Sequence, residues 1–242
     1  MKPIAILETG QPPKALADRY DDYPARFRAL LGDHAATVRF DVQAGKLPGD
    51  PGAFQGAIVT GSAAGVYDDL PWIPPLMDWL RAARGKTRLV GICFGHQAMA
   101  QAFGGVVEKS DKGWGVGLHR YDVTGVESWM HPRAGSIGIP VSHQDQVTAP
   151  PPDARVIAAS DFTPYAGLAW DDAISFQCHP EFQPAYAAAL IELRRGERID
   201  PETADKALAT LYRGDDRAIL TAWIRAFLLL TPPPVEEAGS GI

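Results

Sequence analysis

The segment at residues 89–97 (LVGICFGHQ) constrains the fold of this chain more than any other stretch. An apolar run typical of a buried strand ends at Gly-x-Cys-x-Gly, and a helix-forming stretch follows at residues 97–103. A strand, a sharp turn and a helix in this order predict a nucleophile elbow that presents Cys93. Gly91 and Gly95 would allow a strained backbone, and the positive end of the helix dipole would favour the thiolate. The alternative is a thiol that only packs in the core.

A second informative segment lies far downstream, at residues 173–182 (AISFQCHPEF). An apolar-alternating strand ends there in His179-x-Glu181, and Pro184 can begin a helix. A cysteine nucleophile needs a base to take its proton and a group that orients this base. Two positions apart on an extended strand end, His179 and Glu181 would point the same way, so one ring nitrogen would bind Glu181 and the other would face Cys93. A buried histidine beside a surface glutamate is the alternative.

Strand-like and helix-like segments alternate along most of the chain. Strands are predicted at residues 4–7, 37–42, 57–59 and 87–92, short strands from 106 to 176, and helices from Pro24 and over residues 74–83, 184–195, 201–212 and 216–230. Apolar strands joined by helices predict an α/β fold with a mostly parallel sheet flanked by helices on both faces, followed by a short-strand β region and C-terminal helices.

Several polar residues directly follow predicted strands. Ligands of such sheets bind beyond the carboxyl ends of the strands. The residues that we expect to meet at this edge are Cys93, His179, Glu181, Gly61 and Ser62. Residues that only pack in a core would have no reason to gather there.

The composition is that of an ordinary globular protein, with 46% hydrophobic and 21% charged residues among 242. We expect a single domain over residues 1–230, with a helical C-terminal extension over 184–230 and a disordered tail over 231–242. The net charge of −6 is spread without a Lys/Arg cluster, so no nucleic acid partner is expected. Neither a membrane-length apolar run nor a signal peptide is recognisable, which predicts a cytoplasmic protein without membrane contact.

We expect no metal and no cofactor. Two cysteines make neither a metal cluster nor a disulfide framework, and Cys178 is expected in the core. No Gly-rich phosphate loop is present. Asp68-Asp69 is expected to be a solvated turn, and His96 to be structural. Trp114, set among glycines, would either line a pocket or cover the sheet.

Residues 91–97 together with His179-Pro180-Glu181 resemble the catalytic triad of the class I glutamine amidotransferase family. Residues 59–62 resemble the oxyanion strand of the family and residues 142–147 its substrate-backbone segment. The resemblance extends from about Ile4 to Phe182 and implies a flavodoxin-like sheet. Within the family, the segments at residues 113–117 and 142–147 are most similar to the stand-alone GMP-synthase-like branch, which includes γ-glutamyl peptidases.

The resemblance also implies the chemistry. Cys93 would attack the γ-amide of glutamine to form a γ-glutamyl thioester, with His179 as base and Glu181 as its orienting group. The oxyanion would be held by the backbone N–H of Phe94 and by that of Gly61 or Ser62. This chain has Gly61-Ser62-Ala63 where Gly-Gly-Pro is commoner, which leaves the second donor open. The α-amino and α-carboxylate groups of the substrate would be held by Gln97 and by the backbone of Gln144 and Asp145.

Three functions follow as hypotheses. The first is a glutaminase that delivers ammonia to a separate synthetase chain, because the roughly 60 residues after Glu181 cannot hold a synthetase domain. The second is a self-contained γ-glutamyl peptidase or hydrolase for γ-glutamyl amides such as glutathione-like compounds, and the helical extension favours it because it could wall the pocket. The third is a catalytically silent binding protein, against which the intact triad argues.

Overall fold

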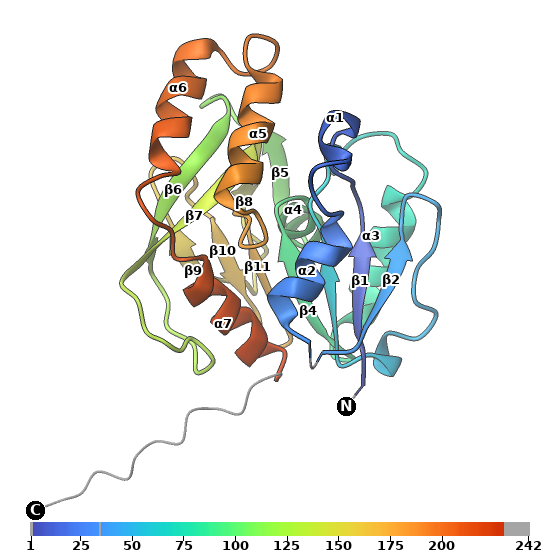
Figure 1. The fold of residues 1–242 in the computed structure, drawn as a ribbon. Coiled ribbons are helices and arrows are strands. Elements are labelled where there is room, and N and C mark those ends of the chain that lie inside the picture. Colours follow the sequence, from blue (N-terminus) through green and yellow to red (C-terminus); the bar gives the residue numbers. More distant parts are fainter. Residues whose placement is uncertain (1, 34, 230–242) are drawn as a thin grey trace, which may run out of the picture.

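In a computed structural model that describes residues 2–33 and 35–229, a large sheet carries helices on both faces (Figure 1). Within these residues, nine strands form this sheet in the order β2-β1-β3-β4-β11-β10-β9-β6-β7. The α/β fold class predicted from the sequence is therefore confirmed. The expected tail at residues 231–242 lies outside the described residues, and the single-domain organisation stays a prediction.

One half of the sheet is parallel. Its strands are β2 (Thr37–Asp41), β1 (Ile4–Glu8), β3 (Gly56–Val59), β4 (Arg88–Ile92) and β11 (Ala173–Phe176). Strands β1, β3 and β11 are buried at every position, because helices cover both of their faces. This half corresponds to the apolar strands that the sequence predicts.

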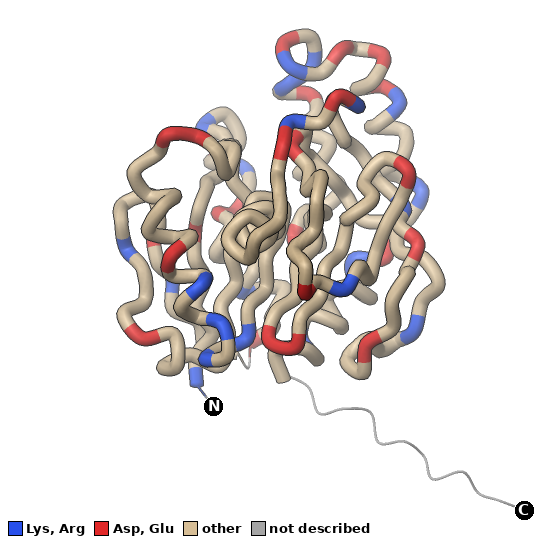
Figure 2. Tube along the Cα trace, turned by 180° about the vertical axis from the view of Figure 1, so that it is seen from behind, with Lys and Arg blue, Asp and Glu red and all other residues tan. Residues whose placement is uncertain are grey.

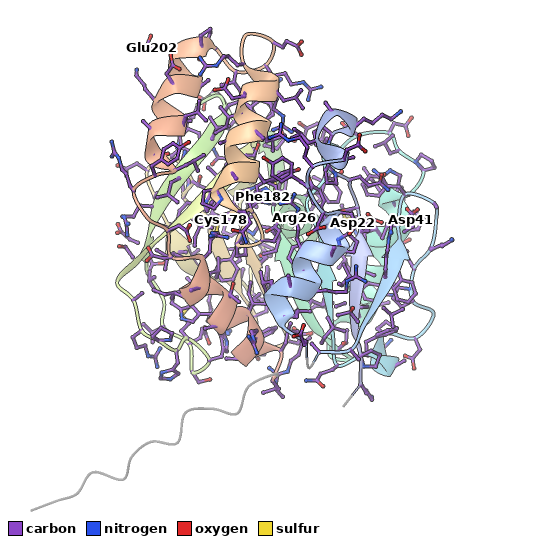
Figure 3. The ribbon with its side chains drawn as sticks, in the orientation of Figure 1. Asp22, Arg26, Asp41, Cys178, Phe182 and Glu202 are labelled. Carbon is purple, nitrogen blue, oxygen red and sulfur yellow. The ribbon has the colours of Figure 1, made fainter. Side chains whose placement is uncertain are left out.

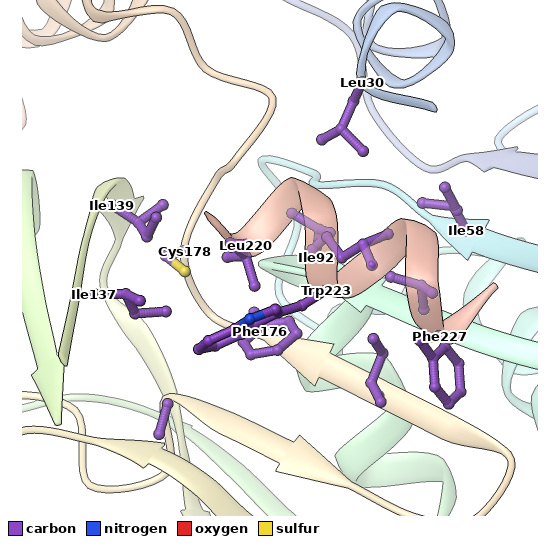
Figure 4. Close-up of a cluster of buried hydrophobic side chains, with 14 of the residues drawn as sticks. Leu30, Ile58, Ile92, Ile137, Ile139, Phe176, Cys178, Leu220, Trp223 and Phe227 are labelled. Atoms are coloured by element: carbon purple, nitrogen blue, oxygen red, sulfur yellow. The ribbon is translucent and has the colours of Figure 1, made fainter. Parts of the chain in front are cut away.

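Two pairs of helices enclose the parallel half (Figure 1). Helices α2 (Tyr23–Leu31) and α7 (Arg217–Phe227) lie on the front face, and α3 (Ile73–Ala83) and α4 (Phe94–Ala102) lie behind the sheet. On the front face, Leu30, Trp223 and Phe227 pack with strand residues such as Ile58 and Ile92 (Figure 4). The apolar stripe of each helix is thus buried against the sheet, which is what positions the ends of the strands.

The other half of the large sheet is antiparallel. It consists of β10 (Gly167–Ala169), β9 (Arg155–Ala159), β6 (Gly115–Val123) and β7 (Ser136–His143). Strands β5 (Val106–Lys109) and β8 (Asp145–Ala149) form a separate antiparallel pair. These are the short strands predicted between residues 106 and 176. Their connections carry no crossover helix, and antiparallel pairing needs none.

The helical extension begins with α5 (Pro184–Arg194) and α6 (Pro201–Thr210). Asp200 caps α6 by accepting a hydrogen bond from the Thr203 N–H. Helix α6 packs closely on β6, where Thr210 accepts a hydrogen bond from the Leu118 N–H at 2.8 Å. Helices α5, α6 and α7 end one, two and three residues earlier than predicted, because the periodic pattern does not fix the last turn of a helix.

Short elements escaped the sequence analysis. Helix α1 (Lys14–Ala17) and the 3-10 turn η1 (Pro51–Ala53) are too brief to show an apolar period. Across the described part of the chain, no helix is long and apolar enough to cross a membrane. Seen from behind, positively and negatively charged residues are interspersed along the Cα trace (Figure 2).

Candidate active site

Cys93 lies at the junction between β4 and α4, as the elbow sequence predicts. Its backbone has φ 54° and ψ −104°, a conformation that residues other than glycine rarely adopt. The Cys93 N–H donates to the Phe176 carbonyl at 2.9 Å, and the Cys93 carbonyl accepts from the Gln97 N–H at 3.1 Å. The neighbouring strand and the first helical turn therefore hold the strained residue from both sides.

Gly91 and Gly95, which flank Cys93, were expected to adopt a strained backbone, but they allow a close approach of α4 to the sheet instead. Neither Gly91 nor Gly95 has a positive φ, so the strain lies on Cys93 itself. A Cβ at Gly95 would overlap the Val59 carbonyl oxygen, and one at Gly91 would lie 2.5 Å from the Gly95 carbonyl oxygen. The glycines are needed because α4 approaches the sheet too closely for any side chain at these positions.

His179 and Glu181 form a buried pair. The His179 Nδ1–H donates to Glu181 Oε1 at 2.7 Å, and the imidazole stacks on the Phe182 ring with centroids 3.8 Å apart. The predicted strand location is wrong, because β11 ends at Phe176 and His179 lies in the turn beyond it. Pro180 cannot donate to a ladder, and the His179 N–H donates instead to Pro140 of β7.

The charges around His179 favour its protonated form. Burial alone would lower the pKa of His179, but the charges of Glu181 and Cys93 and hydrogen bonds to both side chains outweigh it and raise this pKa to about 10. With Nδ1 bound to Glu181, Nε2 is the nitrogen left for Cys93. The protonated form of His179 is therefore the one that this arrangement supports.

The segment after β3, which contains Gly61 and Ser62, packs close to His179 and Cys93. A Cβ at Gly61 would lie 3.1 Å from His179 Cε1 and 3.7 Å from Cys93 Cβ. The Ser62 hydroxyl accepts from the Ala64 N–H at 3.2 Å, so it is used within its own loop. Phe94 is the first residue of α4, where backbone N–H groups have no acceptor inside the helix. Gly61 and Phe94 are therefore both close to Cys93.

A first cavity of about 240 Å³ borders Cys93 and contains the predicted substrate contacts Gln97, Gln144 and Asp145. Gln97 is buried, and its amide donates to the Asp145 carbonyl at 2.9 Å and to Gln177 Oε1 at 3.1 Å. The same carbonyl accepts from His143 Nδ1 at 3.1 Å. The structure therefore brings these residues together and ties the start of β8 to α4.

Arg194 and Arg198 are functional candidates that the sequence analysis missed. Both line the first cavity, as do Asp68 and Asp145. Arg194 donates to Ser142 Oγ at 2.6 Å, and burial lowers the pKa of its guanidinium. Nothing in the local sequence marks these arginines, since only the packing of α5 brings them to the site.

Trp114 was expected either to line a pocket or to cover the sheet, and its side chain does both. It lines the first cavity and packs against the apolar cluster between β6 and the C-terminal helices. The Arg194 guanidinium lies 5.2 Å from the centroid of its ring. The indole thus contributes a cation–π contact that helps to hold Arg194 at the site.

A second cavity of about 380 Å³ also borders Cys93 and shares Ser62, Ser142, Arg194 and Arg198 with the first. His179 and Gly61 line it together with side chains of α5 such as Leu193. Phe182 and Arg26 lie next to each other between α5 and α2 (Figure 3), with the guanidinium 5.9 Å from the Phe182 ring centroid. These side chains support the wall of the site on which His179 stacks.

Other residues have structural roles. His96 is fully buried with Nδ1 2.8 Å from Ser175 Oγ, and burial lowers its pKa to about 3. Cys178 lies in the front core beside Ile139 and Leu220, as predicted (Figure 4). Asp68 accepts from the Gly65 N–H, which makes it part of a turn.

Comparisons with known proteins agree with this geometry. The model of the family "Glutamine amidotransferase class-I" matches residues 35–192. The chain is 27% identical over 214 residues to γ-glutamyl peptidase 2 of Arabidopsis thaliana, covering 84% of this chain and 86% of that protein. It is 36% identical over 135 residues to the glutamine-hydrolysing GMP synthase of Thermus thermophilus, covering 52% of this chain but 24% of that protein. The structure of a glutamine amidotransferase from Methylobacillus flagellatus has the same fold, with a TM-score of 0.74, 24% identity and coverage of 95% of this chain and 93% of that one.

Proposed function

Because the chain belongs to the class-I glutamine amidotransferase family, we propose that it is a cysteine-dependent hydrolase that cleaves the γ-amide bond of a γ-glutamyl compound. One observation carries the proposal. Cys93 at the start of α4 faces a histidine whose Nδ1 is held 2.7 Å from Glu181, and Gly61 closes against both Cys93 and His179. This is the geometry of a nucleophile, a base and an orienting carboxylate.

The first half-reaction forms a thioester. The Cys93 thiolate attacks the γ-carbonyl carbon, and the negative charge moves to the carbonyl oxygen. Backbone N–H groups of Phe94 and of Gly61 or Ser62 stabilise this oxyanion, and such a donor is worth about 3 kcal/mol in comparable sites. The protonated His179 then gives its proton to the departing nitrogen, the C–N bond breaks, and a γ-glutamyl thioester remains on Cys93.

The second half-reaction releases the acid. Neutral His179 takes a proton from a water molecule that attacks the thioester carbon. When the tetrahedral intermediate collapses, the C–S bond breaks, the γ-carboxylic acid leaves, and the Cys93 thiolate and the His179 imidazolium are restored. Glu181 stabilises the imidazolium in both halves.

The first cavity is the proposed site of the glutamyl part. Asp68 and Asp145 offer negative charge for the α-ammonium group, and Lys109, Arg194 and Arg198 offer positive charge for the α-carboxylate. Gln97 and the backbone of Gln144 and Asp145 border the same space. Acidic and basic side chains that line one cavity suit the zwitterion of an amino acid.

We favour a self-contained γ-glutamyl hydrolase, because helix α5 of this chain walls the cavity on the His179 side. The similarity to γ-glutamyl peptidase 2 over most of both chains supports this choice. The second candidate is a glutaminase that delivers ammonia to a synthetase partner, and the 36% identity to the glutamine-hydrolysing GMP synthase favours it.

The test is to incubate the purified chain with glutamine and with a γ-glutamyl dipeptide and to measure ammonia and free amine, with Cys93→Ala as the control. Amine release from the dipeptide by the chain alone supports the self-contained hydrolase. Turnover of glutamine only when a synthetase co-purifies supports the second candidate. Turnover that persists in Cys93→Ala contradicts the role of Cys93 as the nucleophile. Turnover that is missing under all conditions contradicts the hydrolase and leaves a binding protein.

A further inference from the structure

We propose that the 380 Å³ cavity under α5 is a leaving-group subsite, and that it selects γ-glutamyl amides whose amine carries an apolar side chain. This inference rests on the proposed hydrolysis at Cys93 and adds the part of the substrate that is released. We call this space the amine pocket, and its walls include Tyr23, Phe182, Leu190 and Leu193.

Cys93 borders both cavities, which also share Ser62, Ala63, Ser142, Arg194 and Arg198, so one substrate can extend from one cavity into the other. Gln97 and Asp145 line only the smaller cavity, whereas His179 lines only the amine pocket. During catalysis the scissile carbonyl carbon is bonded to the sulfur, so the acyl part and the amine part extend to different sides of it. Since His179 must protonate the departing nitrogen, the amine lies on the side that His179 faces.

The amine pocket is much larger than ammonia needs. A molecule the size of water, which ammonia resembles, accounts for roughly 30 Å³ of liquid volume. The amine pocket has about 380 Å³, which lies in the range of roughly 300–1,000 Å³ typical of small-molecule sites. The space therefore fits an amino acid or a similar amine as the leaving group.

The chemistry of the walls indicates an apolar side chain. Tyr23, Phe182 and Leu190 are buried, and Leu193 is a large apolar residue of α5 that remains 39% exposed. The charged residues Arg194, Glu197 and Arg198 line the same pocket, and the two arginines border the first cavity as well. An apolar lining with charges beside it suits an amine that carries both an apolar side chain and a polar group such as a carboxylate.

The test compares γ-glutamyl-leucine, γ-glutamyl-glycine and glutamine as substrates of the full chain. We expect kcat/KM for γ-glutamyl-leucine to exceed that for γ-glutamyl-glycine at least about tenfold, because losing even one methylene from an apolar pocket changes kcat/KM roughly 10–200-fold. Leu193→Gln should reduce the leucine-to-glycine ratio about fivefold. The exposed side chain makes this substitution compatible with folding, and Leu193→Ala is a second variant expected to change the ratio in the same direction.

Val126→Gln is the matched control, because Val126 is an apolar residue that is 67% exposed and lines neither cavity. It should leave the ratio unchanged. Hydrolysis that requires Cys93 but treats leucine and glycine alike, or a ratio that both Leu193 variants retain, would overturn the amine pocket and leave the proposed function standing. Failure of Cys93 to support hydrolysis of any of the three substrates would overturn both.

Discussion

Cys93 combines a strained backbone with the reactive side chain of the site. Among the described residues other than glycine, Cys93 and Leu229 have a positive φ. A non-glycine residue in such a region destabilises the native state by about 1–3 kcal/mol, and the conformation persists only where the surrounding structure enforces it. The strain is thus a cost in stability that accompanies the presentation of the thiol at the end of β4.

This strain predicts that Cys93→Gly is more stable than Cys93→Ala by about 1 kcal/mol, because glycine relieves the strain but adds chain entropy to the unfolded state. Both variants should lose hydrolase activity. Urea unfolding at pH 7 measures the difference in free energy of unfolding. An alanine variant as stable as the glycine variant would show that the backbone conformation carries no strain.

Buried neutral histidines make stability depend on pH. Burial lowers the pKa of His96 and of His143 to about 3, whereas an unfolded histidine titrates near 6.5. As pH falls below 6.5, these histidines bind protons in the unfolded chain but not in the native chain. The free energy of unfolding therefore decreases until pH reaches about 3. His179 has the opposite sign, because its raised pKa stabilises the native chain below pH 6.5 and this contribution is lost as pH rises toward 10.

When pH is lowered from 7 to 5, we therefore expect His96 and His143 each to decrease the free energy of unfolding by about 2 kcal/mol. His179 should increase it by less than about 1 kcal/mol. Urea titrations at the two pH values measure the change. His96→Asn, which cannot titrate, should lose about 2 kcal/mol less than the unmodified chain. An equal pH dependence of both proteins would contradict the buried neutral state of His96.

The elbow works as a unit of strand, turn and helix. Helix α4 begins with Phe94 directly after the strained cysteine, and Gly95 in its first turn touches the backbone of β3. This contact fixes α4 against the strand that leads to Gly61. The nucleophile and one wall of the site are therefore positioned by a single close approach of helix to sheet.

For this reason we expect Gly95→Ala to destabilise the chain by about 3 kcal/mol, although alanine normally favours a helix over glycine by about 1 kcal/mol. The added Cβ would overlap the Val59 carbonyl, and backbone cannot move away as a flexible side chain can. Gly135→Ala is the control, since no atom lies within 4 Å of a Cβ built there. Thermal unfolding compares the two, and a Gly95→Ala variant as stable as the control would contradict the close approach.

The fold as a whole separates the two cysteines. Cys93 borders both cavities at the carboxyl edge of the parallel strands, whereas Cys178 is 1% exposed within the front core. Burial raises the pKa of the Cys178 thiol, and the charge of Glu181 adds to this effect. Reactivity therefore depends on where the tertiary structure places each thiol.

We accordingly expect a glutamate analogue with an electrophile at its γ-carbon to label Cys93 and to leave Cys178 unmodified. A matched analogue with the electrophile at the α-carboxyl should fail, because the first cavity would hold that end away from the sulfur. Mass-spectrometric peptide mapping measures both labels. Modification of Cys178, or equal labelling of Cys93 by the two analogues, would contradict a γ-glutamyl site.

Short-range patterns were enough to predict the local parts of this protein. Strand and helix periods, proline and aspartate at helix starts, and the Gly-x-Cys-x-Gly turn depend on residues within a few positions of one another. They predicted the parallel strands, the helices on both faces and the elbow at Cys93. The resemblance of a few motifs identified the same family that the comparisons report.

Only the tertiary structure decided how distant segments meet. Periodicity carries no information on strand order, so the antiparallel half of the sheet came from packing. His179 lies beyond the end of β11, where its N–H donates to the Pro140 carbonyl of β7. Arg194 lies at the site because α5 packs where this side chain can donate to Ser142 Oγ. The sequence by itself thus determined which residues are candidates for the chemistry. Long-range contacts, which depend on the whole chain at once, decided the shape and charge of the cavities around them.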